Sequence, residues 1–198
     1  MGGLTLIATP EMITERLILK PLESEDAAQI QRVFPRWEIV RYLVDTVPWP
    51  YPDGAAQHYV DNIALAAVKS GKGWFWSLHR KENELDLIGV ICLMDVPDNN
   101  RGFWLVPEWQ GQGYMSEACQ AVTDFWFEAL NKDVLRAPKA AVNERSRKIS
   151  SRNGMRLIRT DKARYVSGEL DSELWEITRE EWKLIQRGRS FSQSSTGG

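Results

Sequence analysis

The order of predicted elements places this chain in the α+β (mixed α/β) class, as one twisted mixed sheet of about seven strands flanked by about four helices. Apolar residues recur every second position in the predicted strands and about every 3.6 positions in the predicted helices. These elements follow one another in the order βααβββαβαββ. That order is neither a strictly doubly wound fold nor a barrel. The length of 198 residues, with 43% hydrophobic and 26% charged side chains, is typical of one globular domain.

Proline, glycine and helix-capping residues mark the ends of the predicted elements in the first half of the chain. Pro21 closes the first strand, and Ser24 then offers an N-cap to a short helix. Alternate prolines between Val47 and Asp53 exclude regular structure, so the next helix begins at Asp53 and stops at Gly71. The predicted elements are a strand over residues 12–22, a helix over 24–34 and a helix over 53–70.

The second half alternates β-rich runs with two helices. Polar turns separate its strands, and the longer helix has apolar side chains three and four residues apart. The predicted elements are strands over 73–79, 85–96 and 101–106, a helix over 116–130, a strand over 134–142, a helix over 144–153, and strands over 155–166 and 173–179. The end of the chain is rich in Ser and Gly, so we expect one domain over residues 1–182 and a flexible C-terminal tail over 183–198.

Composition excludes several classes of protein. Lys plus Arg is 25 and Asp plus Glu is 27, so the net charge of −2 does not predict a nucleic-acid or membrane partner. Cys92 and Cys119 are too few for a disulfide framework. The longest apolar run, residues 87–94, is far shorter than the roughly 20 residues of a membrane span. We expect a cytoplasmic protein and, because His58 and His79 lack partners at ligand spacing, no metal.

A strand, a turn and a helix carry the strongest chemical signal. Residues 103–117 read Phe-Trp-Leu-Val-Pro-Glu-Trp-Gln-Gly-Gln-Gly-Tyr-Met-Ser-Glu, with Gly111 and Gly113 in the turn. The first N–H groups of a helix are unpaired and lie at its positive end, so the segment predicts an anion site. Tyr114 and Met115 stand where a P-loop needs Lys and Ser or Thr, and the third glycine of a dinucleotide fingerprint is missing. A plain tight turn before a surface helix stays open as the alternative.

With its neighbours, this segment resembles the GNAT superfamily of acetyl-CoA-dependent N-acetyltransferases, and in particular the branch of RimJ/RimL-type ribosomal-protein N-terminal acetyltransferases. The motifs that carry the resemblance are Gln110-x-x-Gly113-x-Met115, Asn143-Glu-Arg-Ser146, Thr14-Glu-Arg-Leu-Ile-Leu-Lys-Pro-Leu22 and Gly111-Gln-Gly-Tyr-Met-Ser-Glu-Ala118. The resemblance covers about residues 12–180. It implies direct transfer of an acetyl group, in a ternary complex, from acetyl-CoA to a primary amine of a protein N-terminus or a small molecule. It also allows a homodimer.

The resemblance assigns roles to individual residues. Those implied to bind the coenzyme are Trp104, Leu105, Val106, Gly111, Gln112, Gly113, Tyr114, Met115, Ser116, Asn143 and Ser146. Asn143 is equally suited to be a helix N-cap. Ser146 is the expected catalytic residue, because its hydroxyl would face the coenzyme sulfur, while Ser150 and water stay open as proton donors. Trp37 and Trp49 border the expected acceptor cleft and are the candidate substrate contacts.

Several assignments stay open at this level. The general base is undecided among Asp95, Asp98, Glu108 and Glu117, each of which is also a plausible solvated charge. A catalytically idle acyl-CoA-binding sensor or interaction module on the same fold is the main alternative function. Nucleic-acid binding through the basic run 145–152 is a weaker one. Of the nine tryptophans, those expected mainly in the core are Trp74, Trp76, Trp104 and Trp126.

Overall fold

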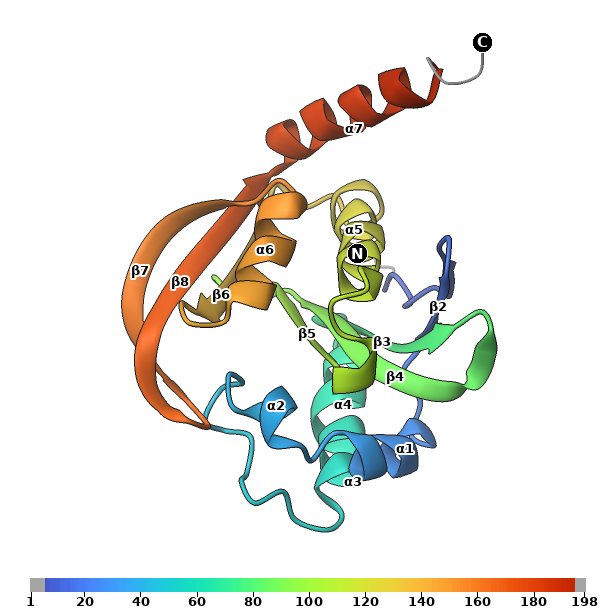
Figure 1. Cartoon of the computed structure of the whole chain (residues 1–198). Helices are drawn as coiled ribbons and strands as arrows, with labels where there is room; N and C mark the ends of the chain where they lie inside the picture. The colour runs from blue at the N-terminus through green and yellow to red at the C-terminus, as the bar shows by residue number, and fades with distance from the viewer. Residues whose placement is uncertain (1–5, 195–198) are drawn as a thin grey trace, which may run out of the picture.

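The structure, a computed structural model, describes the backbone of residues 6–194 and the side chains of residues 6–188 (Figure 1). Its strands form two antiparallel sheets, in the orders β1-β2-β3-β4-β5 and β6-β8-β7. The first sheet contains β1 (Met12–Ile13), β2 (Leu17–Pro21), β3 (Gly73–Arg80), β4 (Asn83–Met94) and β5 (Arg101–Leu105). The second contains β6 (Val134–Ala140), β7 (Arg156–Tyr165) and β8 (Gly168–Thr178). The α+β class is confirmed, with eight strands in two sheets among the described residues in place of one mixed sheet of seven.

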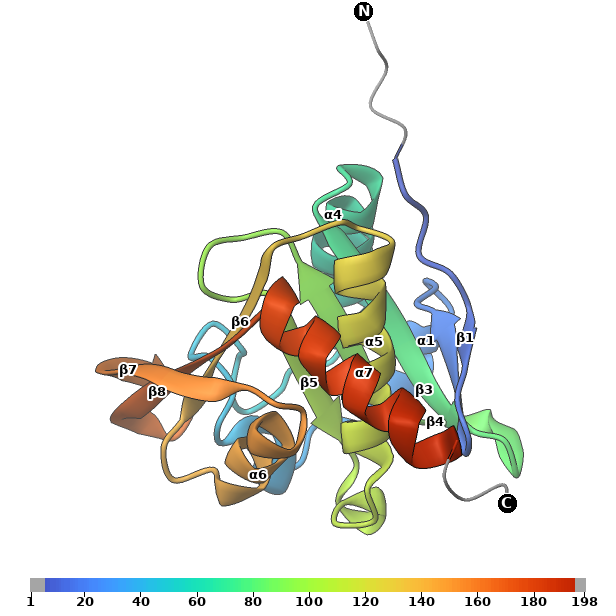
Figure 2. The same cartoon turned by 90° about the horizontal axis from the view of Figure 1, so that it is seen from above.

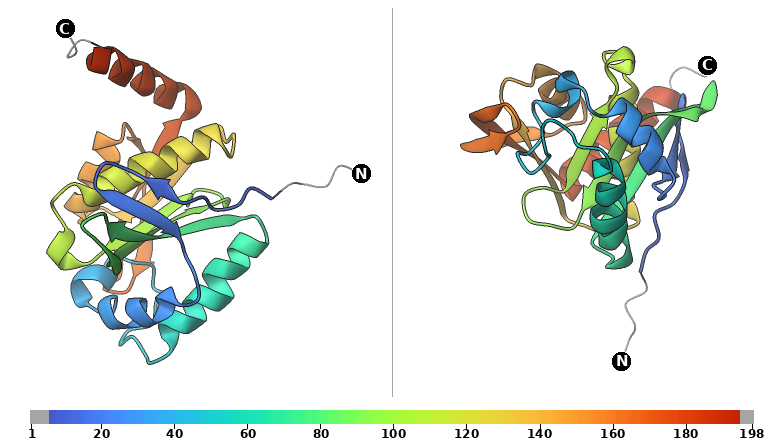
Figure 3. Two further views of the ribbon diagram at one scale, coloured as in Figure 1. Left: turned by 90° about the vertical axis from the view of Figure 1, so that its right-hand side faces the viewer. Right: turned by 90° about the horizontal axis from the view of Figure 1, so that it is seen from below.

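Helices cover both faces of the first sheet (Figure 3). One face carries α1 (Asp26–Val33) and a continuous helix of α3 (Ala55–Tyr59), a π-helical turn over Val60–Ala64 and α4 (Leu65–Lys69). The other face carries α5 (Tyr114–Glu128). Trp74 and Trp76 of β3 pack in the core on the α5 side, and Phe75 packs in the core on the α1 side. Because β3 is buried on both faces, its run Trp74-Phe75-Trp76 is apolar without alternation.

The two sheets meet at the beginnings of β5 and β6. The Asn100 N–H donates to the Arg136 carbonyl oxygen at 2.7 Å, and the Arg136 N–H donates to Asn100 Oδ1 at 2.8 Å. Beyond this junction the two strands are the facing edges of separate sheets and diverge, with α6 (Glu144–Arg152) near the open end (Figure 2). An edge strand leaves main-chain donors and acceptors unpaired, so this divergence creates a place where another extended chain can bind.

The hairpin of β7 and β8 arches over to the loop that follows α2 (Trp37–Val40) (Figure 1). The Val166 N–H donates to the Leu43 carbonyl oxygen at 3.0 Å, and the Ser167 N–H donates to the Arg41 carbonyl oxygen at 3.2 Å. The tip of the second sheet is therefore fixed to the helical layer of the first. This bridge closes one side of the space between the sheets.

The C-terminal segment differs from the expected tail over residues 183–198. Helix α7 runs over Arg179–Ser194 and leads away from the body of the molecule (Figure 1). Thr178 and Glu181 form a capping box in which the Glu181 N–H donates to Thr178 Oγ1 at 3.2 Å and Glu181 Oε2 accepts from the Thr178 N–H at 2.8 Å. Trp182 then packs into the core. The sequence did not predict this helix, because the Ser/Gly-rich composition of the C-terminal segment favours a tail. Residues 195–198 lie outside the described residues.

Other departures from the predicted elements are small. The predicted strand over residues 12–22 is two strands, β1 and β2, joined by a turn, and α2 was not predicted. Helix α5 begins at Tyr114, two residues earlier than expected, so Tyr114, Met115 and Ser116 belong to the helix. Within residues 6–194, no helix is long and apolar enough to cross a membrane.

Candidate functional site

The glycine turn before α5 has the backbone conformation that its sequence predicts. Gly111 has φ +79° and Gly113 has φ +89°, both in the left-handed region that other residues rarely adopt. A Cβ at Gly111 would meet no heavy atom within 4 Å, so it would project into the open space beside the turn. The first helical hydrogen bond runs from the Glu117 N–H to the Gly113 carbonyl oxygen at 3.0 Å. The N–H groups of the three preceding helical residues thus stand at the positive end of α5.

Arg16, in the turn between β1 and β2, anchors this glycine turn from behind. Its Nε donates to Glu117 Oε2 at 2.8 Å, its backbone N–H donates to Glu117 Oε1 at 2.8 Å, and Nη1 donates to the Gln112 carbonyl oxygen at 2.9 Å. Thr14 Oγ1 donates to Glu117 Oε1 at 2.6 Å. Burial by itself raises the pKa of Glu117, but these hydrogen bonds hold the pKa below its usual range. Glu117 is therefore a structural anion and not a free base.

The turn is also tied to the strand end and to α6. Gln110 Nε2 donates to the Leu105 carbonyl oxygen at 2.7 Å, and Gln110 Oε1 accepts from Arg145 Nη1 at 2.5 Å. Asn153, at the end of α6, donates from Nδ2 to Ser116 Oγ at 3.2 Å. The end of β5, the turn, the start of α5 and α6 therefore surround one open end between the sheets.

Helix α6 presents small polar side chains to this space. Asn143 is its N-cap, since Asn143 Oδ1 accepts from the Ser146 N–H at 3.2 Å, which is one of the two roles expected for it. Ser146 and Ser150 lie one helical turn apart, on the same face as Asn153, which contacts α5. Ser150 is fully buried, and its Oγ has no hydrogen-bond partner among the described residues.

The structure therefore brings the residues expected to bind the coenzyme into one place. Leu105 and Val106 are buried, and Trp104 packs edge-on against Phe34, which follows α1, with ring centroids 5.0 Å apart. Their strand, β5, pairs with β4 on one side only, so the other edge of β5 faces the divergence. This arrangement can hold an extended ligand whose anionic end lies at the glycine turn.

Trp37 and Trp49, the candidate substrate contacts, form an exposed pair. Their ring centroids lie 5.7 Å apart, and the residues are 42% and 41% exposed. Arg36, immediately before α2, pairs with Glu108 in the 3₁₀ helix (Pro107–Trp109) that follows β5. The aromatic pair is thus linked through Arg36 to the end of β5, on the side of the helical layer that contains α1 and α2.

The four candidate bases are all engaged in ion pairs. Asp95 pairs with Lys132 at 2.7 Å, and Asp98 pairs with Arg136 at 2.8 Å. Both precede β5 and lie at its far end from the glycine turn, whereas Glu108 and Glu117 lie beside that turn. The pKa of Glu108 is held low by its own backbone N–H and by Arg36. A general base must be free to take up a proton, whereas each of these four carboxylates is held by a cation.

Sequence inspection missed two buried cations between the sheets. Lys139 of β6 is 6% exposed and Arg101 of β5 is 3% exposed. A signal for Lys139 exists, because Leu135, Ala137 and Lys139 share the inward-facing phase of a strand. Lysine at an inward position is rarely a packing residue.

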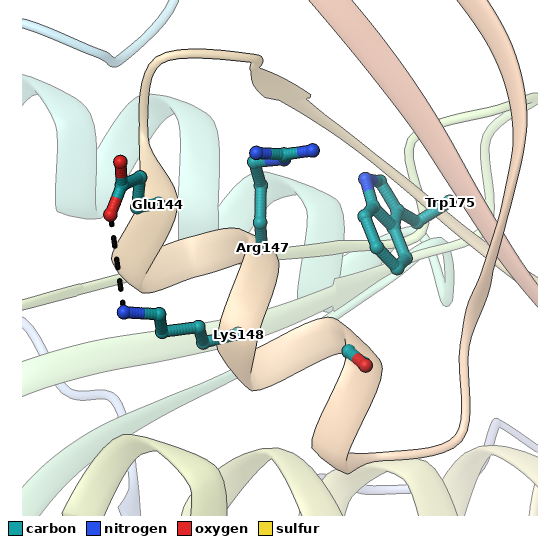
Figure 4. Close-up of a pocket in the computed structure, with 5 residues that line it drawn as sticks. Glu144, Arg147, Lys148 and Trp175 are labelled. Carbon is teal, nitrogen blue, oxygen red and sulfur yellow. Dashed lines mark ion pairs between the residues drawn. The ribbon is translucent and has the colours of Figure 1, made fainter.

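A cavity of about 320 Å³ lies between α6 and the second sheet, lined by Glu144, Arg147, Lys148, Ser151 and Trp175 (Figure 4). Arg147 Nε donates to Glu173 Oε2 at 2.8 Å beside it. The cavity lies on the opposite side of α6 from the face that contacts α5, and it includes none of the predicted site residues. The described residues contain no group of three or more His, Cys, Asp or Glu side chains that is suited to a metal ion.

Comparisons with known proteins agree with this geometry. Residues 16–156 match the family model described as "Acetyltransferase (GNAT) domain". A Bacillus subtilis (strain 168) protein named "Putative ribosomal N-acetyltransferase YdaF" is 30% identical over 105 residues, which are 49% of this chain and 56% of that protein. The chain thus spans little more than half the length of this curated relative.

Solved structures share the fold at low sequence identity. A ribosomal-protein-S5-alanine acetyltransferase from Vibrio fischeri has a TM-score of 0.73 and 19% identity, covering 87% of this chain and 98% of that one. RimL, a ribosomal L7/L12 alpha-N-protein acetyltransferase solved in complex with coenzyme A, has a TM-score of 0.71 and 17% identity, covering 86% of this chain and 97% of that one.

Proposed function

The chain belongs to the family of GNAT acetyltransferase domains, and from this membership we propose that it transfers the acetyl group of acetyl-CoA to a primary amine. The observation that carries the proposal is the glycine turn at the start of α5, which stands beside the open edge of β5. A turn of this kind binds phosphate through backbone N–H groups, and an open strand edge binds the amides of an extended ligand.

In this proposal, backbone groups hold most of the coenzyme. The N–H groups of the turn, from Gly111 to Ser116, bind the pyrophosphate, and the main chain of Trp104, Leu105 and Val106 pairs with the pantetheine arm. Asn143 adds a side-chain contact while it caps α6. The open space beside Gly111 and the left-handed backbone at Gly113 fit this role, because a side chain at either position would obstruct or strain the turn.

The reaction we propose is direct attack of a neutral amine on the thioester carbonyl in a ternary complex. Backbone N–H groups near the end of β5 stabilise the tetrahedral oxyanion, and one such donor is worth about 10²–10³ in rate. Ser146 donates a hydrogen bond to the sulfur as the C–S bond breaks. Because the four candidate carboxylates are ion-paired, we propose that water removes the proton of the acceptor ammonium.

The acceptor class we propose is the amine of a protein N-terminus. The support is that several similar proteins are named as acetyltransferases of ribosomal proteins. Trp37 and Trp49 form an exposed aromatic surface on the side from which the acceptor would approach. Two adjacent rings can pack against the first residues of an extended peptide.

Calorimetry with coenzyme A and a thiol-release assay with acetyl-CoA test the proposal. The acceptor panel contains peptides with free N-termini, the same peptides with blocked N-termini, and small amines. We expect coenzyme binding and turnover that requires a free N-terminus. Absence of coenzyme binding would refute the proposal. Binding without turnover on any amine, unchanged in Ser146→Ala, would indicate a catalytically idle acyl-CoA-binding module.

A further inference from the structure

Two basic side chains, Lys139 and Arg101, lie buried where β5 and β6 begin to diverge. Lys139 Nζ donates to the Ala137 carbonyl oxygen at 3.2 Å and lies 5.7 Å from the centroid of the Trp175 ring. Arg101 donates from Nη1 to Thr123 Oγ1 at 2.8 Å and from Nη2 to Met155 Sδ at 3.1 Å. Within the described residues, neither cation forms a salt bridge, and a buried unpaired charge is costly.

The charged groups around Lys139 come from each of the elements packed on it. Arg101 of β5 and Cys119 of α5 interact with it electrostatically, as does Glu173 of β8, directly across the strand pairing. Glu173 is already engaged, because its Oε2 accepts from Arg147 Nε at 2.8 Å and from Trp175 Nε1 at 2.9 Å. Glu173 is therefore bonded to Arg147 and not to Lys139, whose Nζ has the Ala137 carbonyl oxygen as its one hydrogen-bond acceptor among the described residues.

Two buried polar atoms in this part of the molecule have no hydrogen-bond partner among the described residues. They are Arg101 Nε and Ser150 Oγ of α6. Few buried polar groups in a folded protein lack a partner, so each such group needs an explanation. A ligand that places an electron-rich atom between the sheets would supply the acceptor that these donors lack.

We propose that Lys139 is the proton donor to the coenzyme sulfur, an inference that rests on the proposed acetyl transfer. The acceptor nitrogen forms its bond to the carbonyl carbon, and the tetrahedral intermediate then collapses. The C–S bond breaks, its electron pair stays on sulfur, and a proton passes from Lys139 Nζ to sulfur to give the free thiol. The acceptor nitrogen loses one proton to water as the amide forms, and water returns one proton to Lys139, so charges and atoms balance.

The acidity of the group suits this step. Burial, and next the charge of Arg101, lower the pKa of Lys139 to about 7. A thiol has a pKa of about 8.5, so transfer from this ammonium to a thiolate is downhill. A serine hydroxyl is a far weaker acid than either group. Ser146 and Ser150 therefore fit hydrogen-bonding roles better than the role of proton source.

Two variants of Lys139 separate proton donation from simple charge. Lys139→Met removes both, whereas Lys139→Arg keeps the charge but holds its proton too tightly to donate it. We expect both variants to lower kcat by about 10²-fold or more, with the Kd for coenzyme A nearly unchanged. Lys183→Met, which removes an exposed lysine of α7, is the matched control and should keep wild-type kcat.

A second readout does not depend on turnover. The ultraviolet absorbance of the thiolate in bound coenzyme A reports the pKa of the bound thiol. Because Lys139 is largely neutral at the pH where the thiol titrates, we expect the thiol pKa of wild type to match that of Lys139→Met. In Lys139→Arg, which stays charged, we expect it to lie about one unit lower, a tenfold difference in the ratio of thiolate to thiol. Thermal unfolding of each variant checks that it is folded.

The outcomes distinguish this inference from the function on which it rests. Equal thiol pKa values in all three proteins together with kcat values within twofold of wild type would overturn the role of Lys139 and leave the acetyltransferase intact. A lower kcat in Lys139→Met alone, with Lys139→Arg fully active, would show that only the charge matters and would also overturn proton donation. Failure of wild type to bind coenzyme A would remove both proposals.

Discussion

The two sides of the candidate site are built in different ways. The coenzyme side consists of backbone groups, fixed by Gly111 and Gly113 in left-handed conformations and by Arg16 behind them. The acceptor side consists of exposed side chains, Trp37 and Trp49, which meet because α2 and the proline-rich loop pack together. Backbone-built sites tolerate changes in side-chain identity at most positions, whereas side-chain-built sites vary with each substitution. This contrast predicts one side suited to a constant ligand and another suited to a selected one.

The largest expected effect is on the backbone side. Gly111→Val places a β-branched residue at φ +79°, which costs about 1–2 kcal/mol and favours a rearranged turn. We expect the Kd for coenzyme A, measured by calorimetry, to rise about tenfold or more. Gly54→Val is a matched control, because Gly54 has φ +78° and its added Cβ also meets open space. Equal Kd values in the two variants would contradict a role of the turn in coenzyme binding.

A smaller effect is expected on the acceptor side. Trp37→Ala and Trp49→Ala each remove one ring of the exposed pair, and an aromatic contact of this kind is worth about 1 kcal/mol. We expect the KM for the acceptor peptide to rise about fivefold while the Kd for coenzyme A stays constant. An unchanged KM in both variants would show that these tryptophans do not contact the acceptor and serve only in packing. A changed coenzyme Kd would mean that the two sides are not separate.

The smallest effect concerns the anchor that connects the two strands to the turn. Glu117→Gln keeps the shape but weakens the bonds to Arg16 and Thr14, so we expect a loss of about 1–2 kcal/mol in unfolding free energy and about threefold in coenzyme affinity. The folded-state pKa of Glu117 is lowered. Its contribution is therefore complete above the unfolded pKa of about 4.3 and is lost as the pH falls through the folded pKa.

Denaturant unfolding of wild type and Glu117→Gln at a series of pH values checks this sign. The difference in unfolding free energy should be constant near neutral pH and should shrink only below about pH 4. A difference that grows on acidification would contradict the assigned anion. Glu128→Gln, at the exposed C-terminal end of α5, makes the same chemical change in the same helix without touching its N-terminal anchor and serves as a stability control.

The sequence predicted the backbone conformation of the glycine turn, because the signals for it are local. Glycines followed at once by a helix specify a backbone conformation within a few residues, and both have the expected positive φ. The core tryptophans Trp74, Trp76 and Trp126 were also predictable, since strand and helix periodicity place them inward. The start of α7 was equally local, but the Ser/Gly-rich composition outweighed the capping box at Thr178 and Glu181.

Long-range contacts decided the rest. That Arg16 binds Glu117, 101 residues away, or that Arg145 reaches Gln110, follows from how the sheets are placed and not from any local pattern. The same is true of the sheets: one was predicted and the structure has two, because the division depends on which distant strands pair. The amino-acid sequence by itself determined the elements, the glycine turn and the family. Only the tertiary structure buried Lys139 beside Arg101, because strand periodicity gives the direction of a side chain but not the charges that will surround it.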